Sequence, residues 1–178
     1  MCRYLVLLGV LLSFGCVSKQ DGAYKPYKSR EKKALARVDR SIEMIDVQTN
    51  FNAYVGAEVV WAGIIEEIQF KETERTIQVA FSIDHREFDW MDHGGKAPYR
   101  LSAEGQGRFR AGWAVDKPAR ISNLKTLAKP GYMILIYGTP YRLEDGLVQL
   151  VATAVRPIKE DEFSISAPPF ERMPDVSD

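Results

Sequence analysis

Both histidines of the chain lie in one segment, residues 84–106, and each directly follows an aspartate. Imidazole and carboxylate groups are suitable ligands for zinc or copper. Of these residues, His85, Asp92 and His93 are therefore weak candidates for a metal site. The chain has no HExxH motif and no nearby cysteine to complete a set of ligands. The favoured interpretation is that the histidines are solvated or hydrogen-bonded, and metal binding is the alternative.

Cys16 is a further residue whose position suggests chemistry. Arg3 precedes a short apolar run over residues 4–14, which ends at Gly15 and Cys16. This order is typical of a bacterial lipoprotein signal peptide, which is cleaved before a cysteine that carries a diacyl anchor. The run is also shorter than the roughly 20 residues that a membrane-spanning helix needs. We therefore expect a signal peptide over residues 1–15 and lipidation of Cys16, with simple secretion or an uncleaved anchor as alternatives.

Lipidation of Cys16 would leave the mature chain without a disulfide, because the other cysteine, Cys2, leaves with the signal peptide. Stability must then come from a hydrophobic core, which a mature chain of about 160 residues can form as one domain. Val17 follows the cysteine, as in outer-membrane sorting in enteric bacteria. We expect a protein anchored by its lipid to the outer membrane, on the periplasmic face.

Residues 84–106 are also rich in aromatic side chains, and this suggests a contact surface. Most connections in compact domains have about 4–6 residues, and longer ones are often functional. Trp90, Tyr99 and Arg100 belong to the residue types that are enriched at the centres of protein interfaces. We take them as a candidate contact surface for another envelope protein or a glycan. The alternative is that Trp90 packs back onto the domain.

Ahead of this segment, the sequence predicts a tether and a helix. Residues 16–29 are polar and lack apolar periodicity, so we expect a lipidated tether. The spacing of Leu35, Val38, Ile42 and Ile45 then predicts one apolar face of a helix, with Ser29 as its N-cap. This face packs on the domain or, alternatively, binds a partner.

The body of the chain has the pattern of strands. Apolar and other residues alternate over residues 76–83 and 108–115, as half-buried strands require. Residues 59–70 are also rich in β-forming types, and Gly63 marks a bend or a close approach of another backbone. Two further strands, 132–141 and 147–155, flank Asp145 and Gly146, a strong signal for a tight hairpin. Residues 121–129 predict a short helix.

This order of elements predicts a mainly β fold: a small five-stranded OB-like Greek-key barrel, with an N-terminal helix and a short helix between strands 3 and 4. A sandwich or an open sheet is the alternative. We assign residues 30–158 to this single domain. Residues 159–178 carry acids and prolines with little pattern, and we expect a flexible tail.

Charge and motifs narrow the function. Lysine plus arginine equal aspartate plus glutamate at 24 each, so no global field attracts nucleic acid or anionic lipid. Barrels that bind single-stranded nucleic acid combine basic and aromatic side chains on one surface. The candidates for such a surface here are Arg108 and Arg110 with Trp61, Trp113 and Tyr137. The neutral net charge, the expected location outside the cytoplasm and the short connections between the predicted strands argue against binding of nucleic acid. We expect the tryptophans in the core. No Gly-x-Ser-x-Gly elbow is present, so we expect no enzyme and no cofactor.

The chain resembles the Slp-type outer-membrane lipoprotein family over residues 51–158. The resemblance is carried by four short motifs in the family's order: Tyr54-Val55-Gly56; Val59, Trp61, Gly63 and Ile65; Gly107-Arg108-Phe109; and Ile136-Tyr137-Gly138-Thr139. It implies an envelope lipoprotein with no established catalytic residues. The leading expectation is thus a non-enzymatic outer-membrane lipoprotein that presents residues 84–106. The alternative is a metal-binding or metal-dependent periplasmic protein that uses the Asp-His pairs.

Overall fold

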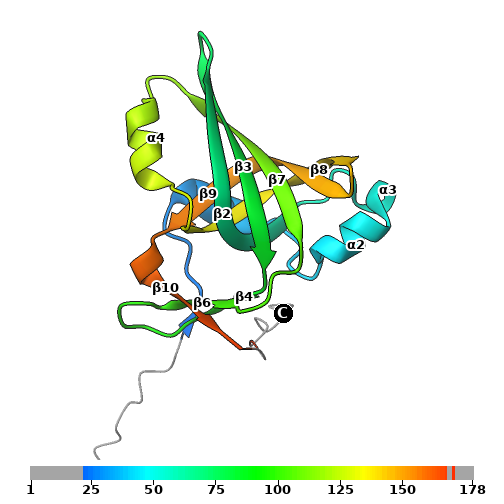
Figure 1. Cartoon of the computed structure of the whole chain (residues 1–178), viewed down its shortest axis with the longest axis vertical. Helices are drawn as coiled ribbons and strands as arrows, with labels where there is room; N and C mark the ends of the chain where they lie inside the picture. Colours follow the sequence, from blue (N-terminus) through cyan, green and yellow to red (C-terminus); the bar gives the residue numbers. More distant parts are fainter. Residues whose placement is uncertain (1–21, 168–169, 171–178) are drawn as a thin grey trace, which may run out of the picture.

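The computed structural model describes residues 22–167 and residue 170 (Figure 1). The predicted signal peptide, Cys16 and the first part of the predicted tether lie outside the described residues. So does most of the predicted tail beyond residue 167. Among the helices of the described part, none is long and apolar enough to cross a membrane.

A closed five-stranded barrel forms the body of the molecule, which confirms the predicted OB-like fold (Figure 1). Its strand order is β2-β3-β7-β9-β8, and only the β7–β9 pair is parallel. The predicted short helix, α4 (Ile121–Leu127), connects the third and fourth strands of the barrel. The five strands are β2 (Val59–Glu72), β3 (Thr76–Arg86), β7 (Arg108–Asp116), β8 (Met133–Glu144) and β9 (Leu147–Ile158).

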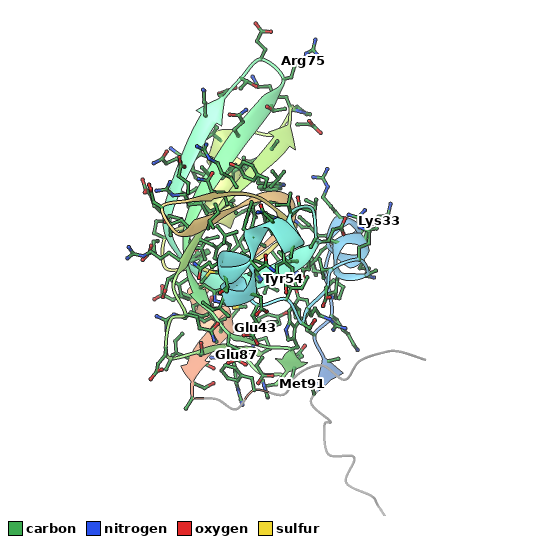
Figure 2. The ribbon with its side chains drawn as sticks, turned by 90° about the vertical axis from the view of Figure 1, so that its right-hand side faces the viewer. Lys33, Glu43, Tyr54, Arg75, Glu87 and Met91 are labelled. Carbon is green, nitrogen blue, oxygen red and sulfur yellow. The ribbon has the colours of Figure 1, made fainter. Side chains whose placement is uncertain are left out.

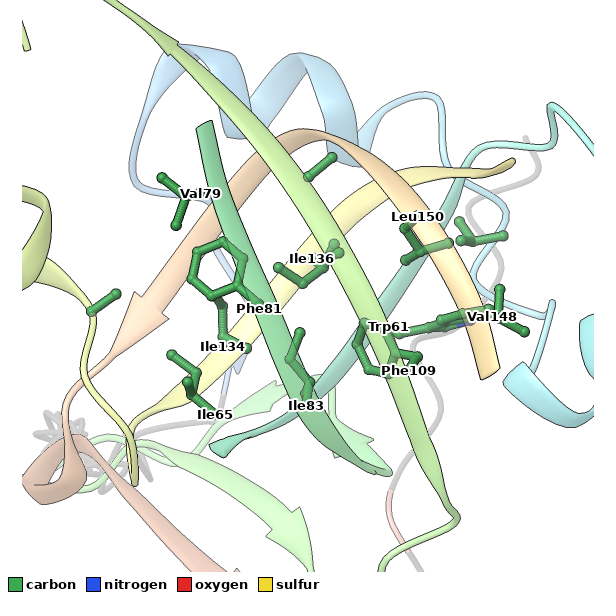
Figure 3. Close-up of a cluster of buried hydrophobic side chains, with 14 of the residues drawn as sticks. Trp61, Ile65, Val79, Phe81, Ile83, Phe109, Ile134, Ile136, Val148 and Leu150 are labelled. Atoms are coloured by element: carbon green, nitrogen blue, oxygen red, sulfur yellow. The ribbon is translucent and has the colours of Figure 1, made fainter. Parts of the chain in front are cut away.

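Alternate residues of these strands fill the barrel. On β3, Ile77, Val79, Phe81 and Ile83 are buried, as the alternation predicted. Figure 3 shows part of this core, in which Phe81 and Ile83 lie close to Ile134 and Ile136 of β8 and Phe109 of β7. Trp61 is in the core as expected, whereas Trp113 is only partly buried.

Gly63 lies where the predicted close approach occurs. It pairs with His85 of β3 on one side and with Ile134 of β8 on the other. A Cβ atom added at Gly63 would lie 2.2 Å from the carbonyl oxygen of Asp84. The absence of a side chain therefore lets the first barrel strand run against its neighbour.

The prediction of one N-terminal helix with a continuous apolar face is wrong beyond residue 35. The chain instead forms three short helices, α1 (Ser29–Leu35), α2 (Met44–Thr49) and α3 (Phe51–Tyr54). After α1 has ended, the Asp39 carboxylate accepts hydrogen bonds from the backbone N–H and the hydroxyl of Ser41, a local turn that competes with helical bonding. Its backbone also bridges to Val59 of β2. Ile45 is 58% exposed.

The N-cap prediction is shifted by one residue. Lys28 precedes the helix, and Ser29 is the first helical residue. The Glu31 carboxylate accepts the backbone N–H groups of Tyr27 at 2.8 Å and Lys28 at 3.4 Å. This carboxylate therefore satisfies backbone donors just ahead of α1, as the third helical residue does in a capping box.

Residues 84–106 form short strands that add a second layer to the barrel. β6 lies between β4 and β10 in a three-stranded sheet, and β5 pairs with β1. Two expectations are corrected here: residues 22–24 of the predicted tether and residues 160–166 of the predicted tail are part of the fold. The elements are β1 (Gly22–Ala23), β4 (Phe88–Asp89), β5 (Met91–Asp92), β6 (Tyr99–Ser102), the 3-10 helix η1 (Glu160–Glu162) and β10 (Phe163–Ser166).

Candidate binding site

The segment 84–106 leaves the barrel and returns to it at one point. His85 donates its backbone N–H to Gly107 at 2.8 Å, and its carbonyl accepts the N–H of Gln106 at 2.9 Å. The Arg86 guanidinium pairs with Asp84 at 2.8 Å and donates to the carbonyl of Ser102 at 3.1 Å. The base of the segment is therefore closed by backbone and side-chain bonds, and the residues that it carries have fixed positions.

A cavity of about 340 Å³ lies beneath this base. Its walls come from five parts of the chain: the loop at Arg40–Glu43, the start of β2 including Trp61, residues 85–90, Gln106 and Phe170. Figure 2 shows Glu43 and Glu87 near one end of the molecule, opposite Arg75 at the tip of the β2–β3 hairpin. Elements distant in sequence thus combine apolar walls with charged groups in one hollow.

His85 is the most unusual residue of this cavity. Only 6% of it is exposed, and its ring meets the edges of Trp61 and Phe109 with centroids 6.0 and 5.9 Å apart. Nδ1 is buried and has no hydrogen-bond partner among the described residues. Burial lowers the pKa of His85 to about 4, against a smaller opposing effect of the Asp84 charge. The imidazole is therefore neutral at pH 7.

The other predicted metal candidates lie in a different environment. His93 Nε2 is 2.7 Å from Asp89 Oδ2, and Asp92 accepts the backbone N–H of Gly94 at 2.9 Å. Both interactions help to close the turn that follows β5. Throughout the described residues, no group of three or more histidine, cysteine, aspartate or glutamate side chains is arranged to hold a metal ion. The structure therefore does not join His85, Asp92 and His93 into one site.

The predicted contact residues lie on the second layer. Trp90 and Tyr99 pack around Tyr24 with ring centroids 5.7 Å away in both cases, and Phe88 contacts Trp90 at 4.8 Å. Trp90, Tyr99 and Arg100 are each half-buried. Trp90 thus packs back onto the domain while keeping part of its surface accessible, and Tyr99 and Arg100 follow each other on β6, so their side chains point to opposite faces of that strand.

Sequence reasoning missed Glu31, which is the centre of a buried polar cluster. Glu31 is 3% exposed and accepts hydrogen bonds from the hydroxyl groups of Tyr24 and, at 3.3 Å, Tyr137. Arg156 lies 3.6 Å from the same carboxylate. Burial is the main cause that raises the pKa of both tyrosines. The cluster ties the N-terminal segment to the barrel, and only its acid-in-helix position was visible in the sequence.

The His85 cavity suits recognition by hydrogen bonds. It offers a neutral imidazole, an aromatic wall and a charged rim. Ser41 lines the same cavity, but its hydroxyl is 2.6 Å from Asp39 Oδ1 and is engaged there. A polar group of a ligand or of a partner's side chain can be accepted beside His85 with its apolar part against Trp90 and Phe88.

No protein-family model matches the chain, and no curated protein matches it.

Proposed function

We propose that the protein is a non-enzymatic lipoprotein of the Slp type, anchored through Cys16 to the periplasmic face of the outer membrane. In this proposal, the OB-like barrel presents the second layer and the His85 cavity to a ligand or another envelope protein. The anchor is supported by the order of charge, apolar run, glycine and cysteine in residues 3–16.

The observation that carries the binding role is the cavity itself, which brings the neutral ring of His85, aromatic side chains and charged groups together in one hollow. Because the ring is neutral at pH 7, it can donate to or accept from an uncharged polar group.

Metabolic labelling with a fatty-acid analogue tests the anchor. We expect label on the wild-type protein and on a Cys2→Ala variant, and none on Cys16→Ala. Cys2 is a matched control because it lies in the predicted signal peptide, so its loss leaves the mature protein unchanged. An unlabelled wild type, or equal label on the Cys16→Ala variant, would refute the lipid anchor.

Site-specific photo-crosslinking in intact cells tests the contact surface. A photoreactive residue in place of Glu87, in the cavity wall, is expected to give a discrete adduct. The same residue in place of Arg75, at the opposite end of the molecule (Figure 2), serves as the control. Equal adducts at both positions, or none at Glu87, would contradict a binding role for this face.

A further inference from the structure

A second and larger cavity, of about 590 Å³, is lined by none of residues 84–106. It extends from the start of α1 past β9 to the inner face of α4. Figure 1 shows α4 standing beside β9 at the edge of the barrel. The cavity therefore connects the molecular surface with the barrel interior, independently of the His85 cavity.

The pairing of the strands explains why space remains here. β7 pairs with β9 only over residues 109–112 and 148–151. Beyond these residues β7 continues to Asp116 and β9 to Ile158, and no pairing joins the two strands there. A register shift between Ala152 and Ala154 further turns β9 away from its earlier alternation. Side chains of α4 cover this opening without filling it.

The inner walls are apolar. Phe81 of β3, Trp113 of β7 and Leu124 of α4 line the cavity from three sides, with Val155 of β9 on a fourth. Leu127 at its edge is 54% exposed, although it is a large hydrophobic residue. A surface of this kind gains free energy when a hydrocarbon group removes it from water.

One end of the cavity is basic. Lys28, Arg30 and Arg156 line it there, against the acids Glu31 and Glu162. Arg156 faces the buried carboxylate of Glu31, so Lys28 and Arg30 at the surface supply the excess positive charge. An occupant with an apolar body and a negative end therefore matches the cavity in both polarity and charge.

We propose that this cavity binds a free long-chain fatty acid. The hydrocarbon chain lies against Phe81, Trp113, Leu124 and Val155, and the carboxylate lies at Lys28 and Arg30. The volume falls within the range of about 300–1,000 Å³ that is usual for small-ligand sites. Each methylene group that enters adds to the favourable transfer from water, so affinity rises with chain length.

Binding is tested with the fluorescent fatty acid 11-(dansylamino)undecanoic acid. The protein is the complete mature chain with Cys16→Ser, which prevents lipidation, so no detergent is needed. We expect saturable enhancement of dansyl emission and displacement of the probe by unlabelled palmitate. Val155→Phe should fill the cavity and weaken binding about tenfold or more, whereas Val151→Phe, four residues away on β9 and 49% exposed, should leave it within about twofold.

A charge-reversal pair tests the carboxylate end and remains informative if Val155→Phe does not fold. The Lys28→Glu, Arg30→Glu double variant should weaken binding of the probe about fivefold but leave its methyl ester unaffected. Lys32→Glu, Lys33→Glu, on the same helix but outside the cavity lining, is the matched control.

The proposal is overturned if the folded wild type shows no saturable binding of the probe. It is also overturned if Val155→Phe and the Lys28→Glu, Arg30→Glu double variant both bind the probe like the wild type. Organic extraction of protein purified from envelopes identifies the lipid that the protein binds in the cell. Free fatty acid in the extract supports the proposal, and phospholipid alone contradicts it. Photo-crosslinking at Glu87, which lines only the other cavity, should be unaffected by these variants, so failure of the fatty-acid proposal is distinguishable from failure of the proposed function.

Discussion

His85 links protonation to stability at the scale of a single residue. Its pKa is about 4 in the folded protein and about 6.5 in an unfolded chain. Between these values the unfolded chain binds a proton that the folded chain does not. The free energy of unfolding therefore falls as the pH is lowered from 7 to 4, by on the order of 3 kcal/mol from this residue.

Urea denaturation at pH 7, 5.5 and 4 measures this effect. His85→Phe removes the titrating group, so the variant should lose less stability than the wild type over the same interval. Other groups titrate equally in both proteins and cancel in the comparison. Parallel pH profiles for the two proteins would show that His85 is not a buried neutral base.

Gly63 sets a steric limit at the same scale. A Cβ atom would lie 2.2 Å from the Asp84 carbonyl oxygen and 2.6 Å from Ile83 Cγ2, so two strands would have to separate. We expect Gly63→Ala to lower the free energy of unfolding by about 1–3 kcal/mol. Gly112→Ala is the control, because its nearest atom would be 4.0 Å away, and its effect should stay within about 0.5 kcal/mol. Thermal or urea unfolding of both variants decides, and equal stability would contradict the close approach.

At the scale of elements, Glu31 fastens α1 to the barrel. Glu31→Ala would leave Arg156 and the hydroxyl groups of Tyr24 and Tyr137 without their shared acceptor. Breaking a buried pair in this way costs about 3–5 kcal/mol. Limited proteolysis and urea unfolding should both register the loss as earlier cleavage near α1 and a lower midpoint.

The matched control for this prediction is Glu58→Ala. Glu58 pairs with Arg37 at 3.0 Å, but the Arg37 side chain is 57% exposed. Exposed pairs contribute about 0–1 kcal/mol, so Glu58→Ala should change stability little. A loss for Glu58→Ala as large as that for Glu31→Ala would mean that burial of the charge is not the cause.

The second layer depends on β10, which is added from the C-terminal end of the chain. Phe163 to Ser166 pair in parallel with Tyr99 to Ser102 of β6. Removal of residues 159–178 should therefore accelerate amide hydrogen exchange in β6, whereas removal of residues 171–178 should not. Unchanged exchange in the longer truncation would show that β6 does not need β10.

Elements with a long, regular pattern were predictable from the sequence, and short ones were not. β3 alternates over eight residues, and the Asp145-Gly146 turn takes the positive φ angles, 51° and 75°, that its residue types favour. β4 and β5 have two residues each, which is too few for any periodicity. β5 depends on β1, a segment far away in the chain, and β4 pairs with β6 within residues 84–106.

The prediction of one continuous N-terminal helix was wrong for a different reason. Leu35 and Val38 pack against the cluster that contains Tyr24, whereas Ile42 packs against the barrel core. Their spacing imitates one helical face although the residues serve two separate packing surfaces. In the same way, the sequence predicted a functional role for residues 84–106, which include His85, but the cavity at His85 also requires Trp61 and the loop at Arg40.

At the scale of the whole molecule, stability rests on the packed core. The two cysteines of the chain, Cys2 and Cys16, both precede the described residues, so no disulfide links elements of the described fold. We expect the urea midpoint of the mature chain to be the same with and without dithiothreitol. A lower midpoint under reducing conditions would contradict a core-only fold.

Under the proposed anchor, the pairing of β1 with β5 limits how far the β1 edge can lie from the bilayer. Gly22 pairs with Asp92 in the second layer, so residues 17–21 are the connection between Cys16 and the domain. A fully extended chain covers about 3.3–3.6 Å per residue, so this connection spans about 20 Å at most. If Cys16 carries the proposed anchor, the β1 edge therefore lies within about 20 Å of the bilayer, and the hairpin tip at Arg75 lies at the opposite end of the molecule from Met91 (Figure 2).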